Sequence, residues 1–506
     1  MKKRRVQTVL ASALTVSLVA GCAGGSNPQT GAGEGGGEPS GPTKITIMAN
    51  LHTPEVPDPT IEKMLEEKTN TDLTIQWVPD GSYEEKLNAS FATGTLPQVV
   101  YMKNQTSLLM FRDAIRNDQF WEIGPLLNDY PNLKNLDPNV LNNVSVDGKI
   151  YSLYQERPLS RQGLIYRKDW ADALGLSAPK NLEELYNMAK AFKEQDPDKN
   201  GKADTIGFTD RSDLVYGAFK TLASYHGVPN NWGIQDSKLI PEFMDPAYIE
   251  AMKYVRKLHQ EGLINQDFPV TSKTDQQNLF ITGKAGLYVG AMGDVVSLHQ
   301  KMVEVNPNIE LDVQNRIEGP KGLGIWAIPG YGSAVLFPKS AIKSEAELRA
   351  ILSFFDQLMS PELANLIYYG VEGKHYTLKD GKAEITKDTK LHEREVKAYQ
   401  ALQIGGPSTI KMLESLFTLP AKEKAEKLTL DNNQFLIHDP TAPLDSKTYT
   451  ERGTRLQEII KDATYKFMLG SIDEAGFQQE VEKWRKDGGD QIIEEFNASY
   501  QAAQKK

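Results

Sequence analysis

The sequence of 506 residues contains a single cysteine, Cys22. With one thiol, no disulfide can form within the chain, so stability has to come from the burial of apolar side chains. The length is sufficient for two or more lobes of roughly 100 to 200 residues each. The hydrophobic and charged fractions, 40% and 25%, are typical of a globular protein and exclude global disorder.

The sequence also lacks the patterns that carry common enzyme chemistry. Its seven histidines are scattered, and it has no His-Glu-x-x-His motif, no nucleophile elbow and no phosphate-binding glycine loop. Acidic pairs such as Glu66/Glu67 lie in helical patterns, where a solvated helix face is the simpler explanation. We therefore expect a protein that is not an enzyme.

Long apolar runs are missing except near the N-terminus. Four basic residues precede an apolar run over 6–20, which is typical of an export signal and is shorter than the about 20 residues that span a membrane. The run ends in Leu-Val-Ala-Gly-Cys22, which resembles the lipobox of bacterial lipoproteins, in which the cysteine is lipidated. We expect residues 1–21 to be a lipoprotein signal peptide. Cys22 would then anchor the protein to the outer face of the cell membrane through lipid alone; the alternative is a secretory signal with a chance cysteine.

Residues 22–43 are rich in glycine, serine and proline and predict a flexible linker behind the lipidated cysteine. Removal of residues 1–21 takes away four positive charges and changes the formal net charge from −10 to −14. A chain this acidic is not expected to bind nucleic acid.

Strand and helix patterns alternate at the start of the folded part. KITIMAN (44–50), TDLTIQWVP (71–79) and LPQVVYM (96–102) predict strands, and helical patterns lie between them. This order predicts an α/β fold with a mostly parallel sheet, in which ligands collect beyond the carboxyl ends of the strands. The last third of the chain is mostly helical in pattern.

Five short motifs follow one another along the chain: GTLPQVV (94–100), YRKDW (166–170), LGL (174–176), TGKAG (282–286) and GVEGKHYT (370–377). In this order, and behind a lipobox, they resemble the family 1 extracellular solute-binding proteins of ABC transporters. The closest likeness is to the carbohydrate-binding lipoproteins of Gram-positive spore-formers. Gln98 stands where that family usually has aspartate.

The resemblance implies a two-lobed periplasmic-binding-protein-like fold of type II. Each lobe would be a mostly parallel sheet flanked by helices, with a helix-rich C-terminal part. We assign 44–158 and 334–370 to lobe 1, and 159–333 and 371–506 to lobe 2.

The function that the resemblance implies is that of a lipid-anchored substrate-binding component of an ABC importer. The protein would bind an oligosaccharide between its lobes and deliver it to permease subunits, and we expect a monomer. Two alternatives stay open: a binding lipoprotein for a peptide or another small solute, and a surface enzyme that acts on glycans.

The stretch DPDKNGKADT (196–205) offers oxygen atoms at alternate positions. Positions 1, 3, 5, 7 and 9 of a calcium loop would be Asp196, Asp198, Asn200, the Lys202 carbonyl and Asp204. Gly207 replaces the glutamate of an EF-hand at position 12, and TIGFT predicts a strand in place of a helix. Some alginate-binding relatives in the resembled family carry a calcium loop of similar spacing. We expect a structural Ca²⁺, with an ion-free polar turn as the alternative.

Aromatic rings that stack on sugars are the first candidates for ligand contacts. Trp232 and Trp326 lie in loops rich in glycine, proline and asparagine, where an indole has no obvious core to enter. We predict stacking for both, with loop anchoring as the alternative. Loose positional similarity to maltose-type binding proteins adds Asn50, His52, Met102, Tyr216, Met292 and Tyr331.

Arg157 and Arg161 precede the LIYRKD segment, which the resemblance places at a crossing between the lobes. There they could bind sugar hydroxyls or a uronate. The alternatives are an exposed charge and a salt bridge between the lobes.

Overall fold

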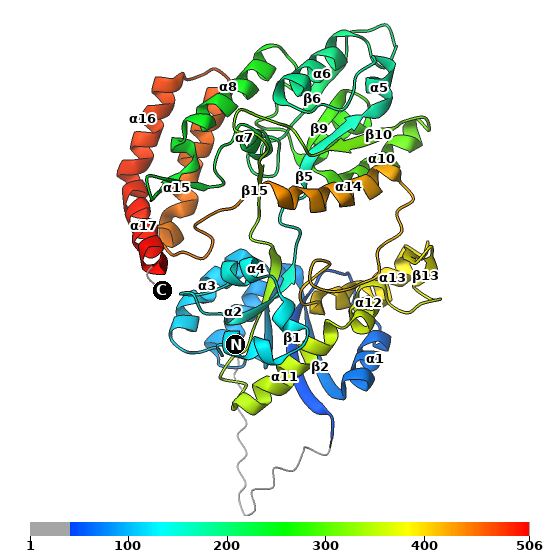
Figure 1. The fold of residues 1–506 in the computed structure, drawn as a ribbon, viewed down its shortest axis with the longest axis vertical. Coiled ribbons are helices and arrows are strands. Elements are labelled where there is room, and N and C mark those ends of the chain that lie inside the picture. The colour runs from blue at the N-terminus through cyan, green and yellow to red at the C-terminus, as the bar shows by residue number, and fades with distance from the viewer. Residues whose placement is uncertain (1–40, 505–506) are drawn as a thin grey trace, which may run out of the picture. The chain divides into compact units, whose positions relative to one another are not determined.

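The structure is a computed structural model that describes residues 41–504, and within 42–504 two sheets each carry their own helices (Figure 1). The signal peptide and Cys22 lie outside the described residues, so those expectations stay predictions. No helix in the described part is long and apolar enough to cross a membrane.

The sheet of lobe 1 has five strands in the order β2-β1-β3-β12-β4. β1 pairs in parallel with β2 and β3, and the predicted β-α-β-α-β order is confirmed. The strands are β1 (Thr43–Leu51), β2 (Thr71–Pro79), β3 (Val99–Met102), β4 (Ser152–Glu156) and β12 (Tyr331–Leu336). The helices of this lobe are α1 (Thr60–Thr69), α2 (Tyr83–Ala92), α3 (Gln105–Arg116), α4 (Pro138–Asn143), α11 (Glu345–Leu358) and α12 (Pro361–Tyr369).

The sheet of lobe 2 has four strands in the order β10-β5-β9-β6. Its strands are β5 (Gln162–Arg167), β6 (Ile206–Thr209), β9 (Ala285–Ala291) and β10 (Leu311–Gln314). The helices of this lobe are α5 (Lys168–Ala173), α6 (Leu182–Glu194), α7 (Phe219–Tyr225), α8 (Pro246–Gln260), α9 (Lys273–Ile281), α10 (Val295–Val305), α14 (Pro420–Asp431), α15 (Lys447–Met468), α16 (Glu474–Trp484) and α17 (Asp490–Gln504). The two-lobed α/β fold and the helix-rich C-terminal part are confirmed.

The sheets are mixed, whereas mostly parallel sheets were expected. β12 runs antiparallel to β3 and β4, and β5 runs antiparallel to β9 and β10. The physical reason is the connectivity: β12 and β5 each come directly after a crossing between the lobes, so the chain enters the sheet from the opposite direction at β12 in lobe 1 and at β5 in lobe 2.

Three two-stranded pairs complete the strands of the described part. β7 (Trp232–Gln235) and β8 (Lys238–Pro241) form a hairpin, as do β13 (Tyr376–Lys379) and β14 (Lys382–Ile385). β11 (Ile325–Trp326) pairs in parallel with β15 (Leu436–Ile437), which ties the C-terminal region to the strand before the second crossing.

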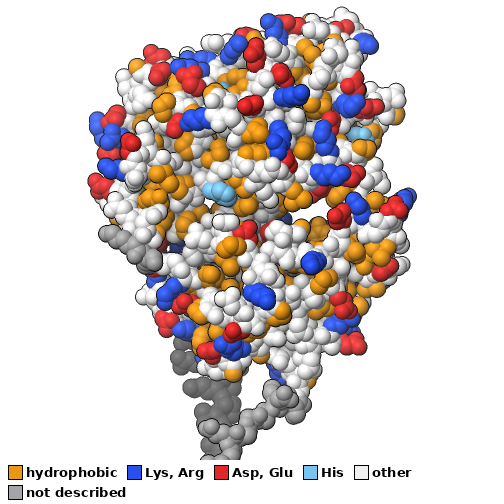
Figure 2. Space-filling view, viewed as in Figure 1, with side chains coloured by type: hydrophobic (Ala, Val, Ile, Leu, Met, Phe, Trp, Pro, Cys, Tyr) orange, Lys and Arg blue, Asp and Glu red, His pale blue; other side chains and the backbone are white. Residues whose placement is uncertain are grey.

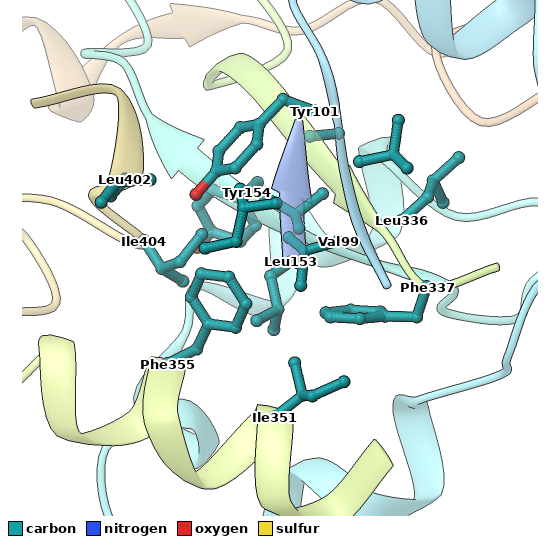
Figure 3. Close-up of a cluster of buried hydrophobic side chains, with 14 of the residues drawn as sticks. Val99, Tyr101, Leu153, Tyr154, Leu336, Phe337, Ile351, Phe355, Leu402 and Ile404 are labelled. Carbon is teal, nitrogen blue, oxygen red and sulfur yellow. The ribbon is translucent and has the colours of Figure 1, made fainter. Parts of the chain in front are cut away.

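The segment after residue 371 differs from the predicted division of the chain. Tyr399, Leu402, Ile404 and Ile410 belong to the core of lobe 1, and Figure 3 shows Leu402 and Ile404 among the buried side chains of that core. Ala421, in α14, already packs in a cluster of lobe 2. We therefore propose that lobe 1 continues to about residue 410; an apolar pattern alone cannot tell which of two cores a side chain enters.

The motif GVEGKHYT (370–377) forms a buried contact within lobe 1. His375 is fully buried, and its Nδ1 accepts a hydrogen bond of 2.9 Å from the backbone N–H of Val371. Its Nε2 therefore carries the proton and donates to Glu395, which is the last residue of α13 and also binds Lys374 and Arg394. α13 spans Thr389–Glu395. Lys374 and His375 of this motif therefore make contacts within lobe 1.

Candidate functional site

Two chain crossings between the lobes lie side by side. The first is 157–161, between β4 and β5, and the second is 327–330, between β11 and β12. The backbone N–H of Arg157 donates to the Gly330 carbonyl over 2.9 Å, and that of Ile328 donates to the Leu159 carbonyl over 2.8 Å. The two crossings are thus hydrogen-bonded to each other and form a two-segment hinge.

Three asparagine side chains hold the backbone of these crossings. Asn432 Nδ2 donates to the carbonyls of Ser160 and Gln162 over 3.1 and 3.0 Å. Asn230 Nδ2 donates to the Ala327 carbonyl over 2.7 Å, and Asn143 Nδ2 donates to the Pro329 carbonyl over 3.0 Å.

The sequence carried no signal for these asparagines, because their partners lie more than 90 residues away. They position the hinge and do not identify a ligand.

A polar cluster lies where the strands of the lobe 1 sheet end. Asn50 Nδ2 donates to Asp80 Oδ1 over 3.0 Å and lies 2.9 Å from His52 Nε2. Lys103 Nζ donates to the Asp80 carbonyl over 2.9 Å. Asn50 and His52 are thus brought together as predicted candidates, while Asp80 and Lys103 were missed although each directly follows a predicted strand.

The charge of this strand-end cluster is balanced internally. Partial burial raises the pKa of Asp80, but the hydrogen bond from Asn50 and the charge of Lys103 outweigh it and leave the pKa below its ordinary value. The Asp80 carboxylate therefore stays ionised as a fixed acceptor at the edge of the sheet.

Three other predicted contacts are buried in hydrophobic clusters. Met102 and Tyr331 belong to the core of lobe 1, and Met292 packs in lobe 2 against Gly163. Met102 and Met292 are both 0% exposed. Position at a strand end did not reveal on which face of the sheet each side chain lies, and their ligand role stays a prediction.

The two loop tryptophans also enter the core of lobe 2. The Trp232 ring lies 5.0 Å from that of Phe496, and Trp326 Nε1 donates to Thr221 Oγ1 over 3.0 Å. They are only 6% and 4% exposed. The argument that these indoles have no core to enter is wrong, because the distant helices α17 and α7 supply one.

Tyr216 is the aromatic ring that stays accessible beside Trp326. Its side chain is 52% exposed, and its ring meets that of Trp326 edge-on at 5.8 Å. Since Trp326 directly precedes the second crossing, this pair gives the hinge region a supported aromatic surface of the kind that sugars stack on.

Arg157 and Arg161 lie exposed in the first crossing. Across residues 41–504, neither guanidinium has a carboxylate or a hydrogen-bonding partner. Partial burial lowers the pKa of Arg157, and the positive charge of Arg161 lowers it further.

A salt bridge between the lobes is made by another arginine. Arg112, on α3, donates from Nη1 to Asp445 Oδ1 over 2.6 Å and to the Leu444 carbonyl over 3.0 Å. Leu444 packs in the core of lobe 2. Nothing in the local sequence around Arg112 distinguished it from a solvated helix residue.

The loop 196–204 joins the end of α6 to β6, as the predicted helix-loop-strand order requires. Asp196 accepts from the backbone N–H groups of Asn200 and Gly201 over 3.1 and 3.0 Å. Asn200 Nδ2 donates to Asp198 over 2.7 Å and to Asp204 over 3.1 Å. Two carboxylates therefore converge on the side-chain amide of Asn200, and a third accepts from the backbone of the same turn.

Whether a cation would fit this loop depends on the charges that its side chains already carry. Partial burial raises the pKa of Asp198, and so do the neighbouring Asp196 and Asp204. Lys284 donates to Asp204 over 2.6 Å and lowers the pKa of that carboxyl.

The donor atoms suit a hard cation in kind, since a half-turn of the Asn200 amide would place oxygen at the point of convergence. The arrangement itself is not a formed site, because no group of three or more His, Cys, Asp or Glu in the described part is placed to hold a metal ion.

A pocket of about 400 Å³ that is partly open to solvent lies in lobe 2, apart from the crossings. Its wall includes Trp232 and the ion pair between Lys220 and Glu242, whose Nζ and Oε2 atoms are 3.0 Å apart. Trp232 therefore borders a pocket of its own lobe.

Two α/β lobes joined by adjacent crossings, with polar and charged side chains at the strand ends and at the hinge, define a two-lobed solute-binding protein. The chain belongs to the bacterial extracellular solute-binding protein family, whose model matches residues 53–362.

Two relatives from Bacillus subtilis match nearly the whole chain. The polygalacturonan/rhamnogalacturonan-binding protein YtcQ is 42% identical over 505 residues, which is 99% of each chain. The lipoprotein LipO is 34% identical over 514 residues, which is 99% of this chain and 100% of that protein.

Solved structures share the fold at low sequence identity. An HMO-binding, ABC-transporter-associated solute-binding protein from Bifidobacterium longum infantis has a TM-score of 0.72 at 18% identity, covering 92% of this chain and all of the other. The alginate-binding protein AlgQ2, solved without calcium ion, has a TM-score of 0.61 at 18% identity and covers 92% of this chain and 99% of the other. An EF-hand mutant of the Streptococcus pneumoniae protein FusA, with fructo-nystose, has a TM-score of 0.59 at 18% identity and covers 91% and 99%.

Proposed function

We propose that this protein is the substrate-binding component of an ABC importer and captures an oligosaccharide between its two lobes. The observation that carries the proposal is the 42% identity over 99% of the chain to a protein named for binding polygalacturonan and rhamnogalacturonan. The two-segment hinge and the accessible Tyr216 beside Trp326 support closure around a sugar. The favoured ligand is a fragment of such a pectic polysaccharide.

The test is calorimetric titration of the purified chain with a panel of oligosaccharides. Oligogalacturonides and rhamnogalacturonan fragments should bind, while unrelated peptides of similar length should give no heat. Binding of the peptides alone would replace this proposal with the alternative of a peptide-binding lipoprotein.

We also propose that the protein releases its ligand unchanged. Membership of a solute-binding family supports this, and mass spectrometry of an oligosaccharide after prolonged incubation with the protein tests it. Shortened products from the wild type but not from heat-inactivated protein would instead favour a glycan-acting enzyme.

The lipid anchor is proposed on the lipobox-like site at Cys22 and on the full-length likeness to a protein named as a lipoprotein. The variant Cys22→Ala should leave the membrane fraction and appear in the medium, whereas a variant in the linker such as Ser26→Ala should stay with the membrane. An equal distribution of both variants would contradict the anchor. We propose a monomer on the cell surface that works with separate permease subunits.

We further propose that the loop 196–204 holds a structural Ca²⁺. Asp196, Asp198, Asn200, the Lys202 carbonyl and Asp204 would provide its oxygen ligands, and the ion would neutralise the three carboxylates. Two proteins of the same fold support the proposal: AlgQ2, solved without calcium ion, and FusA, solved as an EF-hand mutant.

A further inference from the structure

We propose that Arg157 and Arg161 form a carboxylate-binding site in the first crossing, which selects oligosaccharides with free uronate groups over neutral or esterified ones. This inference rests on the proposed function and assigns its charge selectivity to two named residues.

The Arg157 side chain packs against the backbone of β12 at Gly332. An atom added at the Cβ position of Gly332 would come within 2.4 Å of Arg157 Nε and 3.0 Å of its Cγ. The Arg157 side chain therefore lies directly over the bare backbone of Gly332, where any larger residue would displace it.

The pairing of β12 with β4 is irregular at the same point. The register shifts between Tyr331 and Ser333, opposite Gln155 and Glu156 at the end of β4. Such an irregularity locally re-aims the backbone and the side chains next to it. The position of the Arg157 side chain is thus determined by the edge of the sheet, and Arg157 differs in this from a free surface side chain.

The charge of the pair is uncompensated within the described chain. Other arginines have partners: Arg112 and Arg116 bind Asp445, and Arg316 binds Asp431. Figure 2 shows acidic and basic side chains interspersed over one face of the protein, as expected where most cations have anions nearby.

The acid next in sequence does not compensate the pair, because Glu156 accepts hydrogen bonds from Ser408 and Thr409 over 2.7 and 3.3 Å. In a chain with an excess of acidic residues, two guanidiniums that lie in the same crossing without an acceptor repel each other. An anion that binds both would remove this repulsion.

Ligand chemistry follows from the geometry of the guanidinium group. Its planar fork of N–H donors matches the two oxygens of a carboxylate, and such charge-assisted hydrogen bonds are about twice as strong as neutral ones. The supported ring of Tyr216 lies by the neighbouring crossing, so a sugar ring and its carboxylate would each find a matching surface. A methyl ester keeps the ring and removes the charge, so the ester is the discriminating ligand.

The experiment compares three ligands of equal length by calorimetry: oligogalacturonate, its methyl ester, and a neutral galacto-oligosaccharide. The wild type should bind the acid at least about tenfold more tightly than the ester, with an advantage that shrinks as salt is raised. Arg157→Gln and Arg161→Gln should each weaken acid binding about tenfold and leave ester binding unchanged. Arg452→Gln is the matched control, because Arg452 is exposed on α15 and has no ion pair or hydrogen bond from its guanidinium in the described part.

Several results would overturn the inference while leaving the proposed function in place. These are equal affinity of the wild type for acid and ester, a double variant that still prefers the acid, and equal binding of a sulfated oligosaccharide, which would indicate a general oxyanion site. Failure of every oligosaccharide to bind the wild type would instead overturn the proposed function. Melting temperatures of the variants within about 2 °C of the wild type would show that lost binding is not lost folding.

Discussion

The first crossing and the loop 196–204 both gather charges of one sign, but they differ in what the chain supplies to balance them. In the loop, the carboxylates of Asp196 and Asp204 already receive hydrogen bonds from backbone N–H groups, from Asn200 and from Lys284. At the crossing, the guanidiniums of Arg157 and Arg161 have no hydrogen-bond acceptor and no carboxylate partner in the described chain.

A region that is partly balanced can keep its shape without an added ion, whereas a region without any acceptor gains most when a ligand arrives. The loop should therefore affect stability, and the arginine pair should affect ligand binding.

Glu395 represents a third case, in which the chain supplies all of the opposite charge. Although burial raises the pKa of Glu395, hydrogen bonds from Arg394, Lys374 and His375 outweigh it and lower the pKa to about 2. A lowered carboxyl pKa adds stability that is present above the ordinary value of 4.5 and is lost as pH falls towards 2.

Glu395→Gln should cost about 2 kcal/mol at neutral pH, a value reduced from that of a fully buried pair because Lys374 and Arg394 are partly exposed. In urea unfolding, the difference between wild type and variant should shrink as pH falls below 4.5. A difference that does not change with pH would contradict the assignment.

At the crossing, the largest effect on binding should come from filling the space beneath Arg157. Gly332→Ala should displace the guanidinium and weaken oligogalacturonate binding about tenfold, since the new Cβ would lie 2.4 Å from Arg157 Nε. The same substitution made in Arg157→Gln protein should have little further effect on affinity. Additive losses in this double-mutant cycle would show that Gly332 acts on the ligand independently of Arg157.

At the loop, removal of calcium should lower stability without changing sugar binding. Ca²⁺ at about 100 times its dissociation constant would add about 2.7 kcal/mol, so EGTA should lower the melting temperature by a few degrees, and Ca²⁺ should restore it. Asp198→Asn should abolish this response, while Asp236→Asn, at an exposed aspartate outside the loop, should keep it. A melting temperature indifferent to both EGTA and Ca²⁺ would assign the loop as an ordinary polar turn.

The smallest effect should come from Lys284, which supplies part of the balance in the loop. Lys284→Gln removes an exposed ion pair with Asp204 and should lower the stability of calcium-free protein only slightly, because solvent screens such a pair. Because a competing ammonium is lost, the melting temperature should then rise more with calcium than in the wild type. An unchanged calcium response would show that Lys284 does not compete with the ion.

Much of the framework was visible in the sequence because it depends on local patterns. Alternating apolar residues predicted β1 and β2, and the helical pattern between them predicted α1. The end of α6, the loop after it and the start of β6 followed from the same reasoning. The position of Asn50 and His52 at a strand end also followed, since strand ends gather at one edge of a parallel sheet.

Which side chains are available to a ligand was decided only by tertiary structure. The local sequence predicted loops at Trp232 and Trp326, yet both residues lie in strands, and Phe496 and Thr221 come from distant parts of the chain to cover them. The position of the Arg157 side chain likewise depends on Gly332, 175 residues away, and on the register of β12 against β4.

Local patterns are sufficient to predict the α/β alternation, the family and the chemical groups that are present: oxygen ligands in the loop 196–204, two arginines before β5, and a single cysteine at residue 22. The tertiary structure decided which of these groups are neutralised, because a charge is balanced by whatever lies nearest in space. Lys284 reaches Asp204 from 80 residues away, and Ser408 reaches Glu156 from 252 residues away. No partner comes to Arg157 or Arg161 from any described part of the chain, and local periodicity carries no information about such long-range contacts.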